Sequence, residues 1–189
     1  MIGLETIAQY RARTLESLRL PPATPANPDA AIEGPALLIS DETFVSRRAL
    51  SGFLKLAKSR SHPSRLALEP SRLLELFSPL QDLEGDDAGR SAFDVVYIPS
   101  GARLTADEAF SLSAEHWVCP PFREVPLTAP VPHYIFGRES REFTFPVTST
   151  VAMRVRHWVH VLRLCHLMPQ IEILERASQN PIGAARRAA

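Results

Sequence analysis

Residues 37–41 read LLISD, an apolar run that ends on a carboxylate. Residues 36–40 are apolar at nearly every position, which is typical of a strand that is buried on both faces. From residue 46 to residue 58 the apolar positions recur with a period near 3.6, which predicts an amphipathic helix. Ser46 has a hydroxyl that can accept from the free amides of the first turn, so we expect it to be the N-cap. A buried strand followed by such a helix indicates an α/β unit.

A second unit of the same kind follows further along the chain. Residues 93–98, FDVVYI, are the clearest strand because β-branched and aromatic residues dominate them. Thr105 and Glu108 then match a capping box, so a helix to about residue 117 is expected. Between the two units, residues 65–69 predict a strand and residues 71–77 predict a turn or two of helix.

Strands that alternate with helices indicate βα units, which usually build a parallel sheet. We therefore expect an α/β domain of three layers, with a mostly parallel sheet in residues 35–127 and helices on its flanks. Residues 128–180 are expected to add an irregular β part and a helical part. Short strand-like pieces, interrupted by prolines, occupy residues 122–127, 131–136 and 142–147.

The apolar residues of 151–168 predict a helix that Pro169 ends, and residues 170–178 predict a second helix. The first of these helices is apolar around so much of its circumference that one sheet would not cover it. Either another helix of this chain or a second subunit is expected to cover the rest.

The chain divides into four parts by composition. Residues 1–20 predict an amphipathic helix that docks either on the body or on a partner. Residues 21–34 are a proline-rich linker, because proline removes backbone donors and restricts the residue before it. Residues 35–180 form a single α/β domain, and residues 181–189 are expected to be a flexible tail.

Length, charge and cysteine count exclude several classes of protein. The 189 residues are enough for one domain with a real core. The 21 basic and 21 acidic residues balance, so we expect no nucleic-acid partner and no attraction to an anionic membrane. No apolar stretch approaches the length of a membrane span, and charged residues near the N-terminus argue against a secretory signal. Two cysteines make no disulfide framework, so a reducing cytoplasm is the expected location.

Asp41 is the first candidate functional residue. In open α/β sheets ligands bind beyond the carboxyl ends of the strands, and a carboxylate there suits a divalent metal that bridges phosphates. The alternative is that Asp41 only caps the turn or the first helical residues, which aspartate commonly does.

Residues 36–57, ALLISDETFVSRRALSGFLKLA, resemble the middle of a sugar-nucleotidyltransferase domain of the Rossmann-like kind. The resemblance implies that Asp41 coordinates Mg²⁺, the cofactor of a bound nucleotide or sugar phosphate. The chain departs from the family because residues 1–36 hold no glycine-rich phosphate loop, and Gly3 and Gly34 are isolated. A second metal-binding aspartate would also be needed, and Asp94 is inside its strand. The resemblance therefore implies a degenerate or truncated relative.

The predicted C-terminal helix carries a second group of candidates. A zinc site needs four converging ligands, whereas a buried thiol on an apolar stripe behaves as a small hydrophobic group. Basic side chains beside a tryptophan are typical of nucleic-acid contact, but the balanced charge and the lack of repeated aromatic residues favour a solvated or interface-facing edge of a buried helix. The metal candidates are His157, His160, Cys165 and His166, and the basic group is Arg154, Arg156 and Arg163 with Trp158.

Cys119 and Ser100 are candidate nucleophiles, but the sequence does not supply the groups that would activate either of them. A reactive thiol needs a lowered pKa and a base within reach, and nothing orients His116 toward Cys119. Ser100 follows a strand, but the flanking glycines of a hydrolase turn are absent.

Two functions remain open. One is a nucleotidyltransferase-like domain that binds a nucleotide or sugar phosphate with Mg²⁺ at Asp41. The other is a non-catalytic protein-binding or assembly module that uses the N-terminal helix and the helix over residues 151–168. Its partner is either a second copy of the chain, in a homo-oligomer, or another protein.

The first hypothesis predicts that Mg²⁺ with a nucleotide or nucleotide sugar raises the melting temperature, because a ligand that binds only the native state stabilises it. Asp41→Ala should abolish this shift without changing the fold, since the metal loses its carboxylate. Thermal unfolding of both proteins with a ligand panel measures the effect. An unchanged melting temperature across the panel would refute the hypothesis.

Overall fold

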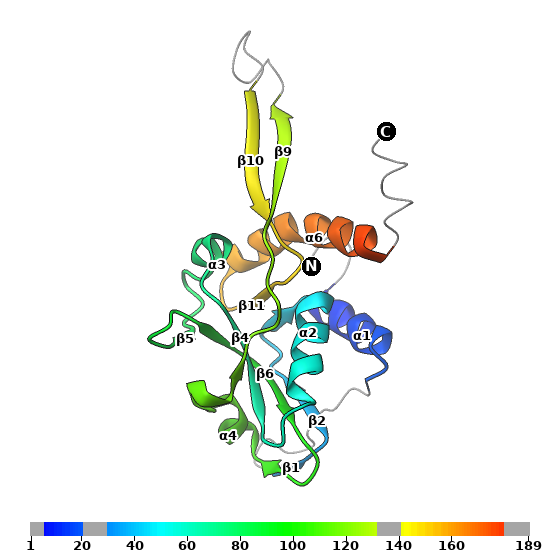
Figure 1. Ribbon diagram of the computed structural model, residues 1–189, viewed down its shortest axis with the longest axis vertical. Coiled ribbons are helices and arrows are strands. Elements are labelled where there is room, and N and C mark those ends of the chain that lie inside the picture. Colours follow the sequence, from blue (N-terminus) through cyan, green and yellow to red (C-terminus); the bar gives the residue numbers. More distant parts are fainter. Residues whose placement is uncertain (1–5, 21–29, 132–140, 180–189) are drawn as a thin grey trace.

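The computed structural model describes residues 6–20, 30–131 and 141–179 (Figure 1). Its main sheet has an antiparallel centre, because β6 pairs antiparallel with a strand on each side. Within the described ranges, β4 and β8 are the one parallel pair. The strands in spatial order are β2 (Ala36–Ile39), β6 (Ser91–Ile98), β4 (Ser64–Leu68) and β8 (Trp117–Val118), and β5 (Glu84–Gly85) pairs with the start of β6.

The expected three-layer, mostly parallel sheet is therefore wrong. The protein is α/β, but its sheets are mixed or antiparallel. β2 and β4 do run in the same direction, with α2 (Arg47–Ala57) between them in the chain, as a βα unit requires. However, β6 lies between them, with Val96 opposite Leu38 on one side and Arg65 on the other. The hydrophobic pattern of a segment predicts that it forms a strand, but it does not indicate which strand lies between β2 and β4.

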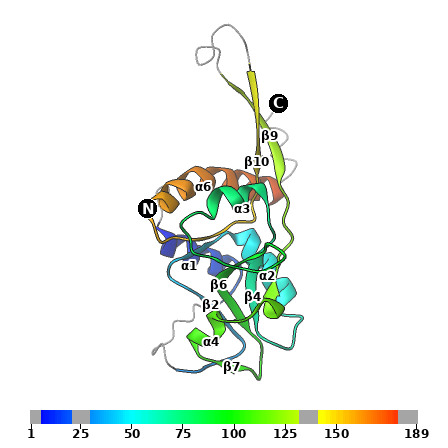
Figure 2. The same cartoon turned by 90° about the vertical axis from the view of Figure 1, so that its left-hand side faces the viewer.

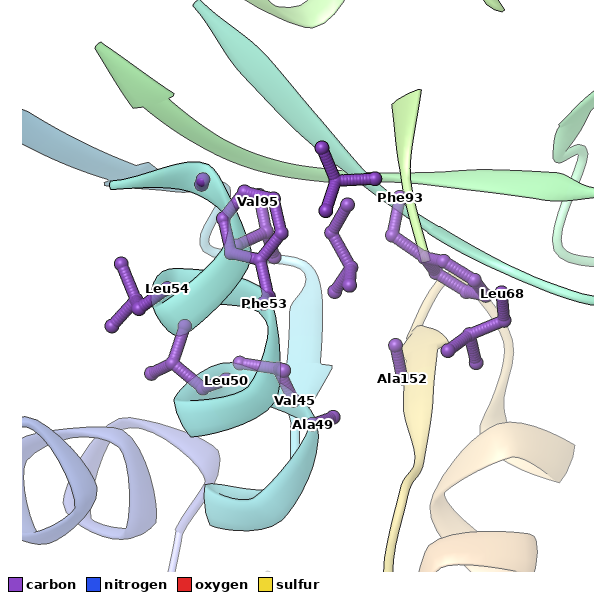
Figure 3. Packing of buried hydrophobic residues seen from close by; sticks show 12 residues of the cluster. Val45, Ala49, Leu50, Phe53, Leu54, Leu68, Phe93, Val95 and Ala152 are labelled. Atoms are coloured by element: carbon purple, nitrogen blue, oxygen red, sulfur yellow. The ribbon is translucent and has the colours of Figure 1, made fainter. Parts of the chain in front are cut away.

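Helix α2 and the sheet form the largest hydrophobic cluster. The Ser46 hydroxyl accepts from the backbone N–H of Ala49 at 3.3 Å, which confirms the expected N-cap. Figure 3 shows Phe53 of α2 directed toward Val95 of β6, and Phe93 of the same strand belongs to the same cluster. Both the strand over residues 36–39 and this helix thus lie where the sequence predicts them. The buried residues of α2 are Ala49, Leu50, Phe53, Leu54 and Ala57.

The opposite face of the sheet is covered by α4 (Ala106–Phe110), which packs Ala109 against Val96 and Ile98. The capping box predicted for this helix is present, with Glu108 accepting from the backbone N–H of Thr105 at 2.8 Å. The helix is shorter than expected, and a 3₁₀ turn, Ala114–His116, follows it. At the same end of the molecule β1 (Ile32–Glu33) pairs with β7 (Arg103–Leu104), so the expected linker ends in a strand.

The expected helix over residues 151–168 is also wrong at its start. Residues 152–154 form β11 (Ala152–Arg154), which pairs antiparallel with β3 (Thr43–Val45). Ser46 stabilises this arrangement, because its hydroxyl donates to the carbonyl of Ser149 at 2.6 Å and accepts from Val151 N–H at 3.0 Å. The pairing partner is more than a hundred residues away in the chain, so the local apolar spacing does not reveal it.

Helix α1 (Ile7–Ser17) docks on the body of this chain, which answers the question that the sequence left open (Figure 1). Tyr10 is 4 % exposed, and its ring lies 5.0 Å from that of Phe44. Most of the proline-rich linker, residues 21–29, and the expected tail at 181–189 lie outside the described residues.

Helix α3 (Arg72–Phe77) lies beside a hairpin of two strands, β9 (Val125–Val131) and β10 (Arg141–Val147). These strands pair antiparallel along their whole length, from Val125 opposite Val147 to Val131 opposite Arg141. Figures 1 and 2 show that the hairpin projects beyond the last helix, α6 (Trp158–Gln179), at one end of the molecule.

A buried ion cluster joins the main sheet to the small β3–β11 sheet. The carboxylate of Asp94 in β6 accepts from Arg65 in β4 at 3.2 Å and from Arg154 in β11 at 2.9 Å. The side chain of Asp94 is 13 % exposed, that of Arg65 2 % and that of Arg154 10 %. Arg65 also donates to the Glu84 carboxylate at 2.6 Å, and Arg154 donates to the carbonyl of Asp82 at 2.6 Å.

Asp94→Asn should lower the free energy of unfolding by about 3–5 kcal/mol, because it leaves two buried guanidinium groups without their shared counter-charge. Chemical denaturation measures the loss. Asp87→Asn is the matched control, since Asp87 is an exposed carboxylate in the loop before β6 and its change should stay within about 0.5 kcal/mol. Equal effects of the two substitutions would contradict the role of the cluster.

Candidate docking surface

Helix α6 has two apolar faces, and the body of the chain covers one of them. The covered face packs against Tyr10 of α1, Phe44 of β3 and Met153 of β11. Four apolar residues of α6 and one histidine form this buried stripe, at spacings of three or four residues. They are His160, Leu164, Leu167, Met168 and Ile171.

The second face of α6 is exposed and also apolar. Trp158 is 67 % exposed, Leu162 49 % and Ile173 66 %. Cys165 and Pro169 lie between them and are exposed as well. At 3.6 residues per turn these five positions fall within about 80° of one another. We call residues 158, 162, 165, 169 and 173 the outer stripe.

Most of the outer stripe has uncharged surroundings, although Glu172 and Arg176 pair at 3.2 Å beside Ile173. Residues 158–171 hold one charged residue, Arg163. Its guanidinium donates to the carbonyls of Phe77 at 3.1 Å and Pro79 at 3.3 Å, so it ties α6 to the end of α3. That neighbouring segment exposes two more large apolar side chains, Leu76 at 58 % and Leu80 at 65 %. Depletion of charge around exposed aromatic and aliphatic side chains is the composition of the centre of a protein interface.

His160 fixes the start of α6. Its Nδ1 accepts from the backbone N–H of Arg156 and of His157, each at 3.1 Å. Its Nε2 lies 3.2 Å from the carbonyl oxygen of Pro79, which can only accept, so the imidazole carries its proton on Nε2. Both ring nitrogens of this buried residue are therefore used in holding the helix.

The histidine and cysteine candidates do not converge on one site. The rings of His157 and His160 lie 6.3 Å apart, but His160 is buried, whereas His157, Cys165 and His166 are exposed. Among the described residues, no group of three histidine, cysteine, aspartate or glutamate side chains is placed to hold a metal ion.

Pro169 lies inside α6 and does not end it, contrary to the expectation from the sequence. Proline removes one intrahelical hydrogen bond, which is the bond to the carbonyl of Cys165. The position is on the exposed face, and the buried residues Leu167 and Ile171 on either side keep the helix attached to the body. Tertiary packing thus outweighs the local propensity.

Asp41 lies in the turn between β2 and β3, just beyond the carboxyl end of β2, as the sequence predicts. Its side chain is fully exposed and accepts from Nη1 of Arg11 at 2.8 Å. The same guanidinium donates to the carbonyls of Ser40 at 2.9 Å and Asp41 at 3.0 Å. Asp41 thus takes part in fastening α1 to the body. Coordination of Mg²⁺ by Asp41 stays a prediction.

The structure also places the three remaining candidates from the sequence, Asp94, Cys119 and Ser100. Asp94 is held by two arginines in the ion cluster. Burial raises the pKa of the Cys119 thiol, although Arg90 acts in the opposite direction, so Cys119 is not activated as a nucleophile. Ser100 is an exposed residue of the turn after β6.

A polar groove of about 230 Å³ lies where α1, α6 and the first turn of α2 meet. The backbone N–H of Arg47 donates to the Tyr10 hydroxyl at 3.3 Å, and Glu175 lines the same groove. The N-terminus of α2 is capped by Ser46, and the negative charge of Glu175 in this groove is favourable near the positive end of the helix dipole. Burial raises the pKa of Glu175 and raises the pKa of Tyr10 to about 12. The sequence reasoning missed Glu175, because nothing in its local pattern places it beside α2.

Comparison of the chain with known proteins found no matching family model, no matching curated protein and no matching solved structure. Across the described residues, no helix combines the length and the apolar character that crossing a membrane requires. A functional proposal for this chain therefore rests on the geometry of the described residues.

The raised pKa of Glu175 predicts a pH-dependent stability difference from Glu175→Gln. Between its ordinary pKa of 4.5 and its higher native pKa, Glu175 binds a proton more tightly in the native state than in the unfolded state. The wild type should therefore lose stability relative to the variant as the pH rises through this range. Melting temperatures of both proteins from acidic to neutral pH measure the difference, and a constant difference would contradict the assignment.

Proposed function

We propose that this chain is a non-catalytic protein-binding module that docks a protein partner on the outer stripe of α6. The observation that supports this is the row of large exposed side chains, Trp158, Leu162 and Ile173, on a helix whose opposite face is already buried. Covering each of them removes apolar surface from water, which is favourable by roughly 25 cal/mol per Å² of apolar surface buried. Exposed apolar patches on this scale commonly mark interaction sites.

The hairpin of β9 and β10 supports the same proposal. A hairpin of two strands is marginally stable by itself in water, and this one projects beyond α6 at the same end of the molecule (Figure 2). A partner that docks on α6 can also contact the hairpin. The partner would then supply the additional strand or helix that stabilises a two-stranded hairpin in water.

Binding is a better fit than catalysis for the residues that the structure describes. Arg11 already pairs with Asp41, and Arg65 and Arg154 already hold Asp94. The N-terminus of α2 is capped by Ser46, and the carboxylate of Glu175 lines the groove beside it. Cys119 and Cys165 are both thiols, which supports a role in a reducing compartment such as the cytoplasm. The balanced charge favours a protein partner over nucleic acid.

A photoreactive amino acid at position 162 in the full-length chain tests the docking surface. On irradiation in cells it should form a protein adduct, because a partner that covers the outer stripe lies within reach of the reactive group. Position 56 on α2 is the control, since Leu56 is also an exposed leucine, at 38 %. No adduct at 162, or equal adducts at both positions, would contradict the proposal.

A further inference from the structure

A pair of histidines, which the proposed function does not use, lies at one end of the β4–β8 strand pair. His62 is separated from β4 by one residue, and His116 directly precedes β8. These strands run parallel, with Arg65 opposite Trp117, so both histidines lie where the strands begin. The two imidazole rings are 5.4 Å apart between centroids, and their planes meet at 89°. The pairing of two distant strands thus brings the two rings side by side.

We propose that His62 and His116 together bind one divalent transition-metal ion, such as Zn²⁺, through their Nε2 atoms. This inference goes beyond the docking function and is independent of it. Neutral imidazole is a preferred ligand of Zn²⁺, Cu²⁺ and Ni²⁺. The two side chains supply two ligands, and water fills the remaining positions, since His62 is exposed and the side chain of His116 is 27 % exposed.

A hydrogen bond on the other ring nitrogen of His62 leaves its Nε2 available to a metal. Nδ1 of His62 lies 3.2 Å from the carbonyl oxygen of Pro63. A carbonyl can only accept, so Nδ1 carries the proton and Nε2 keeps a lone pair. A metal-binding histidine typically donates its second ring N–H to a backbone carbonyl or a carboxylate in this way, which fixes the orientation of the ring.

A short chain of hydrogen bonds produces the same tautomer in His116. The Ser113 hydroxyl donates to the Glu115 carboxylate at 3.2 Å. Because this uses the one hydroxyl proton, the Ser113 oxygen accepts from Nδ1 of His116 at 3.4 Å. The Glu115 carboxylate lies 3.6 Å from the same nitrogen and favours a proton there. Nε2 of His116 therefore also carries a lone pair.

The separation of the two rings suits two ligands of one ion. Zn–N bonds of about 2.0–2.1 Å at a tetrahedral angle place the centroids of two imidazoles roughly 5 Å apart. The observed 5.4 Å is close to this value, and metal–nitrogen bonds allow the ring planes to be perpendicular. A bound ion would link the start of the edge strand β8 to β4 and would stabilise the native state.

Calorimetric titration of the full-length chain with Zn²⁺ tests the site. His62→Ala and His116→Ala should each raise the dissociation constant of one binding step by about 100-fold or more, because loss of a ligand costs at least as much as loss of a group that orients a ligand. His166→Ala is the matched control, since His166 is an exposed histidine on α6, and it should leave that step unchanged. Circular dichroism verifies that all three variants fold.

Ser113→Ala tests the hydrogen bonds that orient His116. Ser113 precedes the 3₁₀ turn but makes no side-chain cap hydrogen bond to it, so its substitution should leave the turn intact. Zn²⁺ binding should weaken by about 10-fold, the lower end of the effect of groups that orient a metal ligand. An unchanged dissociation constant would contradict the role assigned to His116.

Paramagnetic Cu²⁺ tests whether one ion reaches both rings. In nuclear magnetic resonance spectra it should broaden the ring signals of His62 and His116 at the same low metal concentration, because both rings lie next to the ion. Broadening of one ring alone, or Zn²⁺ binding that survives either alanine substitution, would overturn the proposal. A ring contact without a metal predicts a lower melting temperature in both alanine variants and no Zn²⁺ binding step in the wild type, a result that would also overturn it.

Discussion

The structure depends on one shared carboxylate. Asp94, in the central strand β6, accepts from Arg65 of β4 and from Arg154 of β11, and all three side chains are nearly excluded from water. A buried charge costs free energy unless it is paired with an opposite charge, so the cluster is stable only when all of its members are present. Because Arg154 lies four residues before the first residue of α6, this contact sets where the last helix begins.

Two further contacts attach α6 once its start is placed. His160 caps the first turn and donates to Pro79, and Arg163 binds the carbonyls of Phe77 and Pro79. The buried stripe of the helix then meets α1 and the small sheet. With one face covered in this way, the outer stripe is directed to solvent. The surface that we assign to a partner therefore exists because of contacts made inside the chain.

Much of the local structure follows from sequence, and the errors have physical causes. The β2 strand, the α2 helix with its Ser46 cap and the capping box at Thr105 are confirmed, since each depends on neighbours within a few residues. The parallel sheet is wrong, because β6 takes the position between β2 and β4. The sequence also raised the question of what covers the last helix, but it misplaced that helix, since β11 pairs with a distant strand and Pro169 is tolerated on an exposed face.

The sequence by itself determined the periodicity, the caps and the excess of apolar residues around the last helix. Those properties arise from neighbours along the chain and from the chemistry of single residues. The tertiary structure alone decided that Asp94 lies between two arginines, that Arg11 reaches Asp41 and that Tyr10 accepts from the backbone of Arg47. Each of these contacts joins residues far apart in the chain. Which of two apolar helix faces remains exposed is decided in the same way, because packing selects a face and composition does not.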